Sequence, residues 1–181
     1  MRYFYITCFI VCVALSCSCS RDSRIAQEVK GLTGQKIEFP KGYVELTCNS
    51  QFKLDTLTKQ EIKIVSYYGE VVCTPCCAKN LKIWQNEIKE IDKDIAYIIV
   101  AHSPDKEEFV NFADSLYLDY PLMYYDSDVF GKQNKLEDIL ARNRTFLLNK
   151  DNEIVLVGEP FGREQLSKLY KKCIDSLRVQ R

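Results

Sequence analysis

The sequence has no surplus of charge of either sign, and it has only one histidine. Its 25 lysine and arginine residues equal its 25 aspartate and glutamate residues, so the formal net charge at pH 7 is zero. Proteins that bind nucleic acid through charge carry a basic surplus, so we expect no nucleic-acid partner. The single histidine, His102, is the one imidazole that a metal site would have at its disposal.

Long apolar runs are also missing, apart from one at the N-terminus. The uncharged run Tyr3–Leu15 is shorter than the roughly 20 apolar residues that span a membrane, and it is typical of an export signal. Small residues lead from it into Cys17, which resembles a bacterial lipobox and predicts lipid attachment at Cys17. The alternative is a plain signal peptide with incidental cysteines. We expect a signal peptide over residues 1–16 and a polar tether over residues 17–36, with the domain outside the cytoplasm.

The remaining composition is that of an ordinary globular protein. Hydrophobic residues make up 46% of the chain and charged residues 28%, which suits one domain with a real core behind a targeting segment. The nine cysteines are unevenly distributed, because four of them precede residue 20. An odd number therefore remains for the domain, so these cannot all pair within it. The domain cysteines are Cys48, Cys73, Cys76, Cys77 and Cys173.

Two of these cysteines lie where a predicted strand gives way to a predicted helix. The apolar pattern of Ile62–Tyr68 predicts a buried strand, and Cys73 and Cys76 open a segment predicted to be helical to about Ile91. Pro75 suits an early helical position because its missing N–H would be unpaired there. A helix N-terminus carries roughly half a positive charge, and thiols so placed have pKa values of about 3.5–7.5 instead of about 8.5. Since the thiolate is the nucleophile of disulfide exchange, the pattern predicts a dithiol redox site.

Strand and helix patterns alternate through the rest of the chain. Strands joined by helices pair in parallel through right-handed crossovers, and a terminal hairpin adds antiparallel strands. The expected class is therefore α/β, with a central mixed β-sheet flanked by helices. Two weak strand patterns, Tyr43–Thr47 and Phe52–Leu54, predict an N-terminal β-hairpin extension. The other expected elements are strands Ile95–Ala101, Leu122–Tyr125, Thr145–Leu148 and Ile154–Val157, and helices Pro104–Leu116, Val129–Asn134 and Arg163–Leu177.

With these elements in order, the chain resembles the thioredoxin-like lipoproteins of the TlpA, ResA or redoxin type. The residues that carry the resemblance are the strand IVSYYGE, the motif Cys73-Thr74-Pro75-Cys76, and the later segment TFLLNKDNEIVLVGEP. The resemblance implies a thioredoxin-like fold over residues 37–181. It also implies a thiol-disulfide oxidoreductase in which Cys73 attacks a partner disulfide and Cys76 resolves the mixed disulfide.

The chain departs from this family at three places. Members usually carry a cis-proline before the strand that begins here at Thr145, and this chain has Arg144 instead. A cis bond before a non-proline residue costs about 2.5–4 kcal/mol, so we expect a trans peptide. Arg144 either lowers the pKa of the nucleophilic thiol or is an exposed residue of a degenerate site. The tryptophan that commonly precedes the motif is Val72, and the family's buried acid has no clear counterpart, with Ser66 near its position and Glu70 the nearest carboxylate.

Three other functions compete with this interpretation. The spacing Cys73-xxx-Cys77 resembles the copper motif of Sco-type proteins, and soft thiolates suit Cu(I), but His102 does not match the sequence position of their histidine. Cys77 and Cys173 are more simply small buried hydrophobic residues. A peroxidase would have a Pro-xxx-Thr-xx-Cys setting, which Gly69-Glu70-Val71-Val72 does not supply. The third is a thioredoxin-fold lipoprotein that serves as a binding module.

We therefore expect a redox-active, extracytoplasmic thiol-disulfide oxidoreductase anchored to a membrane of the cell envelope. Its expected partners are disulfide or dithiol groups of exported proteins and a membrane-side electron donor. We expect a monomer with no cofactor and no metal. The direction of the reaction is open, because potentials across this fold span about −270 to −120 mV. The expected catalytic residues are Cys73 and Cys76, and the supporting residues are Glu70, Thr74, Pro75, Arg144 and Thr145.

Overall fold

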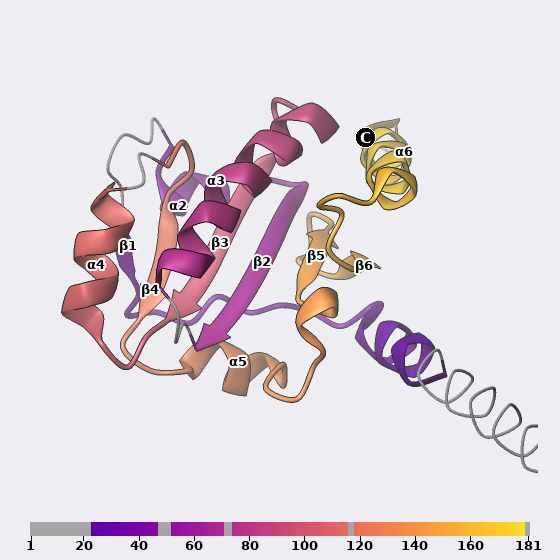
Figure 1. Ribbon diagram of the computed structural model, residues 1–181. Helices are drawn as coiled ribbons and strands as arrows, with labels where there is room; N and C mark the ends of the chain where they lie inside the picture. The colour runs from indigo at the N-terminus through magenta and orange to yellow at the C-terminus, as the bar shows by residue number, and fades with distance from the viewer. Residues whose placement is uncertain (1–22, 47–51, 71–73, 116–117, 180–181) are drawn as a thin grey trace, which may run out of the picture.

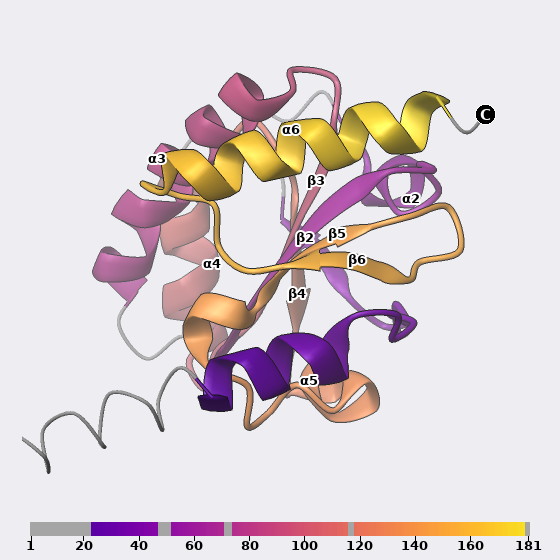
Figure 2. The same cartoon turned by 90° about the vertical axis from the view of Figure 1, so that its right-hand side faces the viewer.

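A central mixed sheet arises because the apolar strands of the chain must be covered on both faces (Figures 1 and 2). The computed structural model describes residues 23–46, 52–70, 74–115 and 118–179, with backbone only at 70, 74–79, 112, 114 and 115. The sheet order is β1-β4-β3-β2-β5-β6. β2, β3 and β4 are parallel, and the other pairings are antiparallel. The strands are β1 (Val44–Leu46), β2 (Lys63–Glu70), β3 (Ala96–His102), β4 (Leu122–Tyr125), β5 (Thr145–Leu148) and β6 (Ile154–Val157).

The helices cover the sheet unevenly. Figures 1 and 2 show α3 and α4 side by side on one face and α2 on the opposite face. α6 lies next to α3 and crosses the part of the sheet formed by β5 and β6. A further helix occupies residues 23–32. The named helices are α2 (Leu54–Leu57), α3 (Thr74–Ile91), α4 (Lys106–Ser115), α5 (Val129–Asn134), the 3₁₀ turn η1 (Ala141–Asn143) and α6 (Glu164–Val179).

The core is the interface between the sheet and these helices. β3 is buried from Ala96 to Ala101, and α3 turns Leu81, Ile88 and Ile91 into the core, as their helical spacing predicts. The exception to apolar burial is Lys63 at the start of β2, which is only 1% exposed.

Most predicted elements are confirmed. The strands Leu122–Tyr125, Thr145–Leu148 and Ile154–Val157 and the helix Val129–Asn134 have the predicted bounds, and β2, β3, α3 and α6 differ by at most two residues. The helix predicted to start at Pro104 instead begins at Lys106. There the Asp105 carboxylate accepts a hydrogen bond from the backbone N–H of Glu108 (2.9 Å) and caps the helix.

The N-terminal β-hairpin prediction needs correction. β1 pairs with β4, with Val44 opposite Tyr124, and not with the segment Phe52–Leu54. Leu54 instead begins α2, where its backbone N–H donates to the Glu45 carboxylate (2.8 Å). β1 pairs with the outer edge of β4 over three residues. A pairing between segments so far apart cannot be predicted from local sequence patterns.

The predicted tether also needs correction over its described part. Residues 23–32 are helical, and Leu32 and Ile37 are buried in the core. The backbone N–H of Gly34 donates to the carbonyl of Ile154 (2.8 Å), and that of Ile154 donates to Gln35 (2.9 Å). The segment therefore pairs briefly with the outer strand β6, and apolar burial fixes it there. The predicted signal peptide and Cys17 lie outside the described residues.

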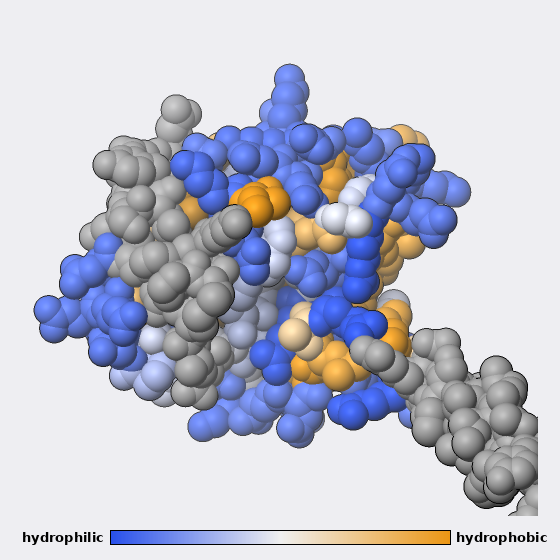
Figure 3. Space-filling model, in the orientation of Figure 1, coloured by the Kyte–Doolittle hydropathy of each residue, from blue (hydrophilic) through white to orange (hydrophobic). Residues whose placement is uncertain are grey.

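Within the residues that the structure describes, no helix combines the length and the apolar character needed to cross a membrane. The described part of the face in Figure 3 is mainly hydrophilic, with hydrophobic residues in small separate areas. The large hydrophobic residues that are exposed are spread over several parts of the chain, with two of them on α6: Val44, Phe52, Ile83, Val129, Leu169 and Val179.

Candidate functional site

The predicted dithiol motif lies where β2 ends and α3 begins. α3 starts at Thr74, so Pro75, Cys76 and Cys77 occupy its first turn, as predicted. Figure 1 shows this helix start at the same edge of the sheet at which β2 ends and β5 begins. Cys73 and Val72 lie outside the described residues, as do the side chains of residues 70 and 74–79. The catalytic roles of Cys73 and Cys76 therefore stay predictions.

Ser66 and Thr145 form a buried polar link directly behind this edge. They face each other in the antiparallel register of β2 and β5, and their hydroxyl oxygens are 3.0 Å apart. The hydroxyl of Tyr97 donates to the Ser66 oxygen (3.1 Å). The interior around Ser66 thus holds neutral hydroxyl groups that satisfy one another.

Arg144 occupies the predicted slot before β5, with the expected trans peptide, since the described residues contain no cis bond. Its side chain is half-buried and donates to the backbone carbonyls of Ile139 (2.9 Å), Glu137 (3.0 Å) and Tyr68 (3.5 Å). The guanidinium carbon also lies 5.3 Å from the centre of the Tyr67 ring. The interpretation of Arg144 as an exposed residue is therefore wrong: Arg144 is tied to the end of β2.

A second polar cluster surrounds the end of β2 on the side of β3. The Tyr67 hydroxyl donates to the Asp128 carboxylate (2.7 Å), which also accepts from the backbone N–H of Gly131 (2.9 Å). Burial, and then the hydrogen bond to Asp128, raise the pKa of Tyr67 well above its ordinary value. His102 lies with Nε2 3.8 Å from the same carboxylate. His102 thus faces a carboxylate, and the described residues contain no cluster of metal-ligating side chains.

Glu159 is a candidate site residue that sequence reasoning missed. It follows β6 and lies with Arg144, Thr145 and Trp84 on one pocket of about 160 Å³. No described group donates a hydrogen bond to its carboxylate. Burial raises the pKa of Glu159, Arg163 opposes the rise and Glu87 adds to it. The residues that line this pocket, called the β2–β5 pocket below, are Ser66, Tyr67, Tyr68, Trp84, Ala141, Arg144, Thr145 and Glu159.

An aromatic stack forms one wall of the β2–β5 pocket. The Trp84 ring stacks on Tyr68 (5.2 Å between ring centres) and on Phe161 (4.8 Å). This stack ties α3 both to β2 and to the loop before α6. Such offset aromatic contacts each add stability of roughly 0.5–1.5 kcal/mol beyond burial, so they hold the middle of α3 against β2 and this loop.

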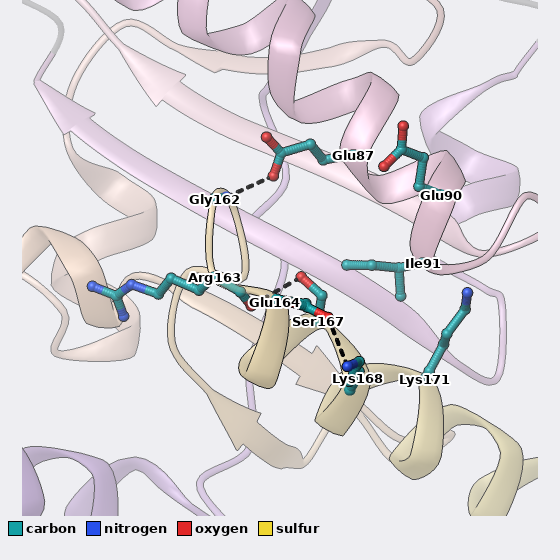
Figure 4. Close-up of a pocket in the computed structure, with 9 residues that line it drawn as sticks. All are labelled: Glu87, Glu90, Ile91, Gly162, Arg163, Glu164, Ser167, Lys168 and Lys171. Carbon is teal, nitrogen blue, oxygen red and sulfur yellow. Dashed lines mark hydrogen bonds and ion pairs between the residues drawn. The ribbon is translucent and has the colours of Figure 1, made fainter.

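One helical turn further along α3, a separate cleft of about 520 Å³ lies between α3 and α6. Figure 4 shows the Glu87 carboxylate pointing to Gly162, whose backbone N–H donates to it (2.8 Å). Glu164 pairs with Lys168 (2.7 Å) on the same cleft. The α3 side of the cleft is acidic, with Glu87 and Glu90, whereas the α6 side includes the basic Lys168 and Lys171. The mixed charge indicates a solvated helix–helix junction.

The structure brings together only part of the predicted site. Arg144 and Thr145 meet Ser66 in the β2–β5 pocket, whereas Glu70, Thr74 and Pro75 are described only through their backbone. Trp84 and Glu159 join them from distant parts of the sequence. A lone glutamate after an apolar strand carries no local signal of function, so only the tertiary structure identifies Glu159.

Comparisons with known proteins agree with this architecture. No protein-family model and no curated protein sequence matches the chain. A crystal structure from Bacteroides vulgatus, titled as a candidate thiol-disulfide oxidoreductase, matches 78% of this chain and 96% of its own with a TM-score of 0.53 and 20% identity. A solution structure from Bacteroides thetaiotaomicron, titled as a candidate protein disulfide isomerase, matches 81% of this chain and 90% of its own with a TM-score of 0.50 and 17% identity.

These likenesses agree with the β2–α3–β3 unit, the β5–β6 hairpin and the closing helix α6. Each identity is low, so the likeness concerns the fold. The chain has the thioredoxin fold.

Proposed function

We propose that this protein is an exported, lipid-anchored thiol-disulfide oxidoreductase that acts through Cys73 and Cys76. The observation that carries the proposal is the start of α3 at Thr74, directly after Cys73 and at the end of β2. The partial positive charge of a helix N-terminus favours a thiolate at this place. The first turn of α3 holds no acidic residue that would oppose this effect.

The neighbours in structure support the same activity class. The Bacteroides vulgatus protein is titled as a candidate thiol-disulfide oxidoreductase, and the Bacteroides thetaiotaomicron protein as a candidate protein disulfide isomerase. Both share the thioredoxin fold with this chain. We extend to this chain the activity that the two titles have in common, with disulfides or dithiols of exported proteins as substrates.

The proposed reaction has two steps. The Cys73 thiolate attacks one sulfur of a client disulfide, and the other client sulfur leaves as a thiolate that takes up a proton. The Cys76 thiol then loses its proton and attacks Cys73, which releases the second client thiolate and leaves a Cys73–Cys76 disulfide. Two electrons have passed to the client, so a dithiol donor at the membrane must return the oxidised motif to its reduced form.

Redox titration followed by alkylation tests the dithiol. The wild type should show a reversible two-electron couple that both Cys73→Ser and Cys76→Ser abolish. Cys173→Ser is the matched control, because Cys173 is unpaired and half-buried against the core on α6. Absence of a couple in the wild type, or a couple that survives Cys73→Ser, would refute the proposal.

The proposed location rests on the N-terminal sequence. Residues 1–16 would direct export, and Cys17 would carry the lipid. Labelled fatty acid should appear in the wild type and in Cys19→Ser but not in Cys17→Ser, and the unlabelled variant should leave the membrane fraction. Label that persists in Cys17→Ser would contradict this assignment. We propose a monomer, and sedimentation of the full chain as a single species of 21.0 kDa is the matching result.

A binding module is the alternative function. The observation that favours it is Arg144, whose side chain fills the slot before β5 and is tied to three backbone carbonyls. A binding module keeps its partner after Cys73 and Cys76 are both replaced by serine. An oxidoreductase of the proposed kind loses the covalent mixed disulfide in the same double variant.

A further inference from the structure

The Glu28 carboxylate joins the helix over residues 23–32 to the loop that leads to β5. Its Oε2 accepts a hydrogen bond from the side-chain amide of Asn143 (2.9 Å) and one from the backbone N–H of Leu140 (3.2 Å). The Glu28 side chain is 13% exposed, and Asn143 is 3% exposed. A carboxylate with two donors in such a place forms strong, well-defined hydrogen bonds.

The helix that carries Glu28 is itself fixed on the domain. Figure 2 shows residues 23–32, in indigo, running across the molecule in front of α5. Leu32 and Ile37 are buried, and the Asn134 side chain on α5 donates to the carbonyl of Glu38 (2.9 Å) and accepts from its N–H (2.8 Å). The Glu28 carboxylate is therefore a rigid support for the loop.

That loop supplies the groups that orient Arg144. The carbonyls of Glu137 and Ile139 accept hydrogen bonds from its guanidinium, while Leu140 and Asn143 are the residues that Glu28 holds. Both ends of the turn over residues 140–143 are thus fastened by one carboxylate. The position of the Arg144 guanidinium therefore depends on the position of this turn.

Arg144 in turn contacts the end of β2. Its Nη1 donates to the Tyr68 carbonyl (3.5 Å), and a Cβ atom at Gly69 would lie only 2.8 Å from the same nitrogen. Gly69 has φ +66°, a conformation that glycine adopts without strain. It stands four positions before Cys73. A continuous series of contacts therefore runs from Glu28 through Arg144 to Tyr68 and Gly69 at the end of β2.

We propose that Glu28 is a positioning residue of the dithiol site, because it holds the Arg144 guanidinium against the end of β2. The effect on the thiols rests on the proposed function, whereas the positioning of Arg144 does not. The proposed function puts the attacking Cys73 shortly after this end of β2, and a cation near a thiolate lowers the pKa of its thiol. Glu28→Ala should therefore raise the pKa of the attacking thiol by roughly half to one unit, which slows alkylation about 3- to 10-fold below that pKa.

Three variants of the full chain test this proposal. Glu28→Gln keeps an oxygen that accepts both hydrogen bonds, so its alkylation profile should match the wild type. Arg24→Ala removes only the exposed partner of Glu28, 3.4 Å away and 65% exposed, and should also match. Glu28→Ala should be the variant with the shifted profile. An unshifted profile in a folded Glu28→Ala, or an equal shift in Glu28→Gln, overturns the proposal.

A double-mutant cycle tests the route through Arg144. Arg144→Met should raise the thiol pKa in the same direction, and Glu28→Ala should then add nothing to it. Additive shifts overturn the route. The NMR signal of the Arg144 Nε–H, which is bonded to the Ile139 carbonyl, gives a readout without thiol chemistry. If this signal moves in Glu28→Ala but the wild type has no redox couple, the proposed function has failed and the positioning role stands. If the signal is unmoved, the positioning role is refuted.

Discussion

The hydroxyl oxygens of Ser66 and Thr145 lie 3.0 Å apart across the β2–β5 ladder, and both residues are buried. Tyr97 completes the network by donating to Ser66. The interior behind the candidate site therefore holds hydroxyl groups instead of a carboxylate. Glu159, whose pKa is raised by burial, also lines the β2–β5 pocket and comes from the loop after β6.

Ser66→Ala should lower the free energy of unfolding by about 1–3 kcal/mol, because buried hydroxyl groups lose a hydrogen-bond partner. Urea unfolding measures this change. The control is Thr33→Ala, whose exposed hydroxyl bonds only to the Val29 carbonyl (2.8 Å) and whose loss should cost less than about 0.5 kcal/mol. Equal costs for the two variants would contradict the role of the buried network.

Arg144→Pro should destabilise the protein even though proline is the usual residue at this slot in the family that the sequence resembles. The backbone N–H of Arg144 donates to the Ala141 carbonyl (3.1 Å), and a proline ring removes that donor. Proline also disfavours the helical conformation of the preceding Asn143 in η1. Arg144→Met, which loses only the side-chain donors, should cost about 1–3 kcal/mol. Arg144→Pro should be less stable than Arg144→Met, and thermal unfolding of both variants measures the difference. A proline variant as stable as the wild type would refute the prediction.

Lys63 should make stability rise with pH above about pH 8. Burial lowers the pKa of Lys63 to about 8, while its unfolded value is near 10.5. Between these values the unfolded chain binds more protons than the folded one, so the free energy of unfolding rises, by about 3 kcal/mol at most. Below pH 8 the cost of burying the charge is fully present, although the ammonium donates to Asn152 (2.5 Å).

The comparison is between Lys63→Met and Lys59→Met, measured as unfolding curves between pH 7 and pH 10. Lys59 is exposed and pairs with Asp55 (3.0 Å), so its replacement should leave the pH slope unchanged. Lys63→Met should flatten the slope. A slope that is the same in both variants would show that another group titrates.

Glu159→Gln should weaken the fall of stability as the pH rises from acid to neutral. Because the pKa of Glu159 is raised by burial, the folded state binds more protons than the unfolded state between the ordinary and the raised value. Stability is therefore lost as the pH rises through this window. Glu164→Gln on exposed α6 is the control. The outcome that would sink this idea is an identical pH profile for the wild type and Glu159→Gln.

Two glycines should respond to alanine in opposite directions. At Gly131 in α5, a Cβ atom would overlap the Tyr67 hydroxyl and the Asp128 carboxylate, and would break the hydrogen bond between them. We expect Gly131→Ala to cost about 1–3 kcal/mol. At Gly31, in the helix over residues 23–32, nothing lies within 4 Å of such an atom, so alanine should stabilise by about 0.5–1 kcal/mol. Denaturant midpoints give both signs, and a tolerated Gly131→Ala would refute the first.

The sequence by itself determined most of the elements and their type, although it missed the helix over residues 23–32 and the short helix α2. Alternating apolar patterns are local, so β4, β5, β6 and α5 could be placed to the residue. The start of α3 next to Cys73 was readable because Pro75 and the helical spacing of Leu81, Ile88 and Ile91 act within one segment. These features depend on neighbours in the chain.

Only the tertiary structure decided which distant groups meet. The pairing of β1 with β4, the Glu28–Asn143 hydrogen bond across 115 positions and the burial of Lys63 all join segments far apart in sequence. Glu159 lines the β2–β5 pocket for the same reason, because its backbone N–H donates a hydrogen bond to the carbonyl of Arg142 (2.9 Å). Such contacts form because buried polar groups must find partners wherever the packed fold brings them together.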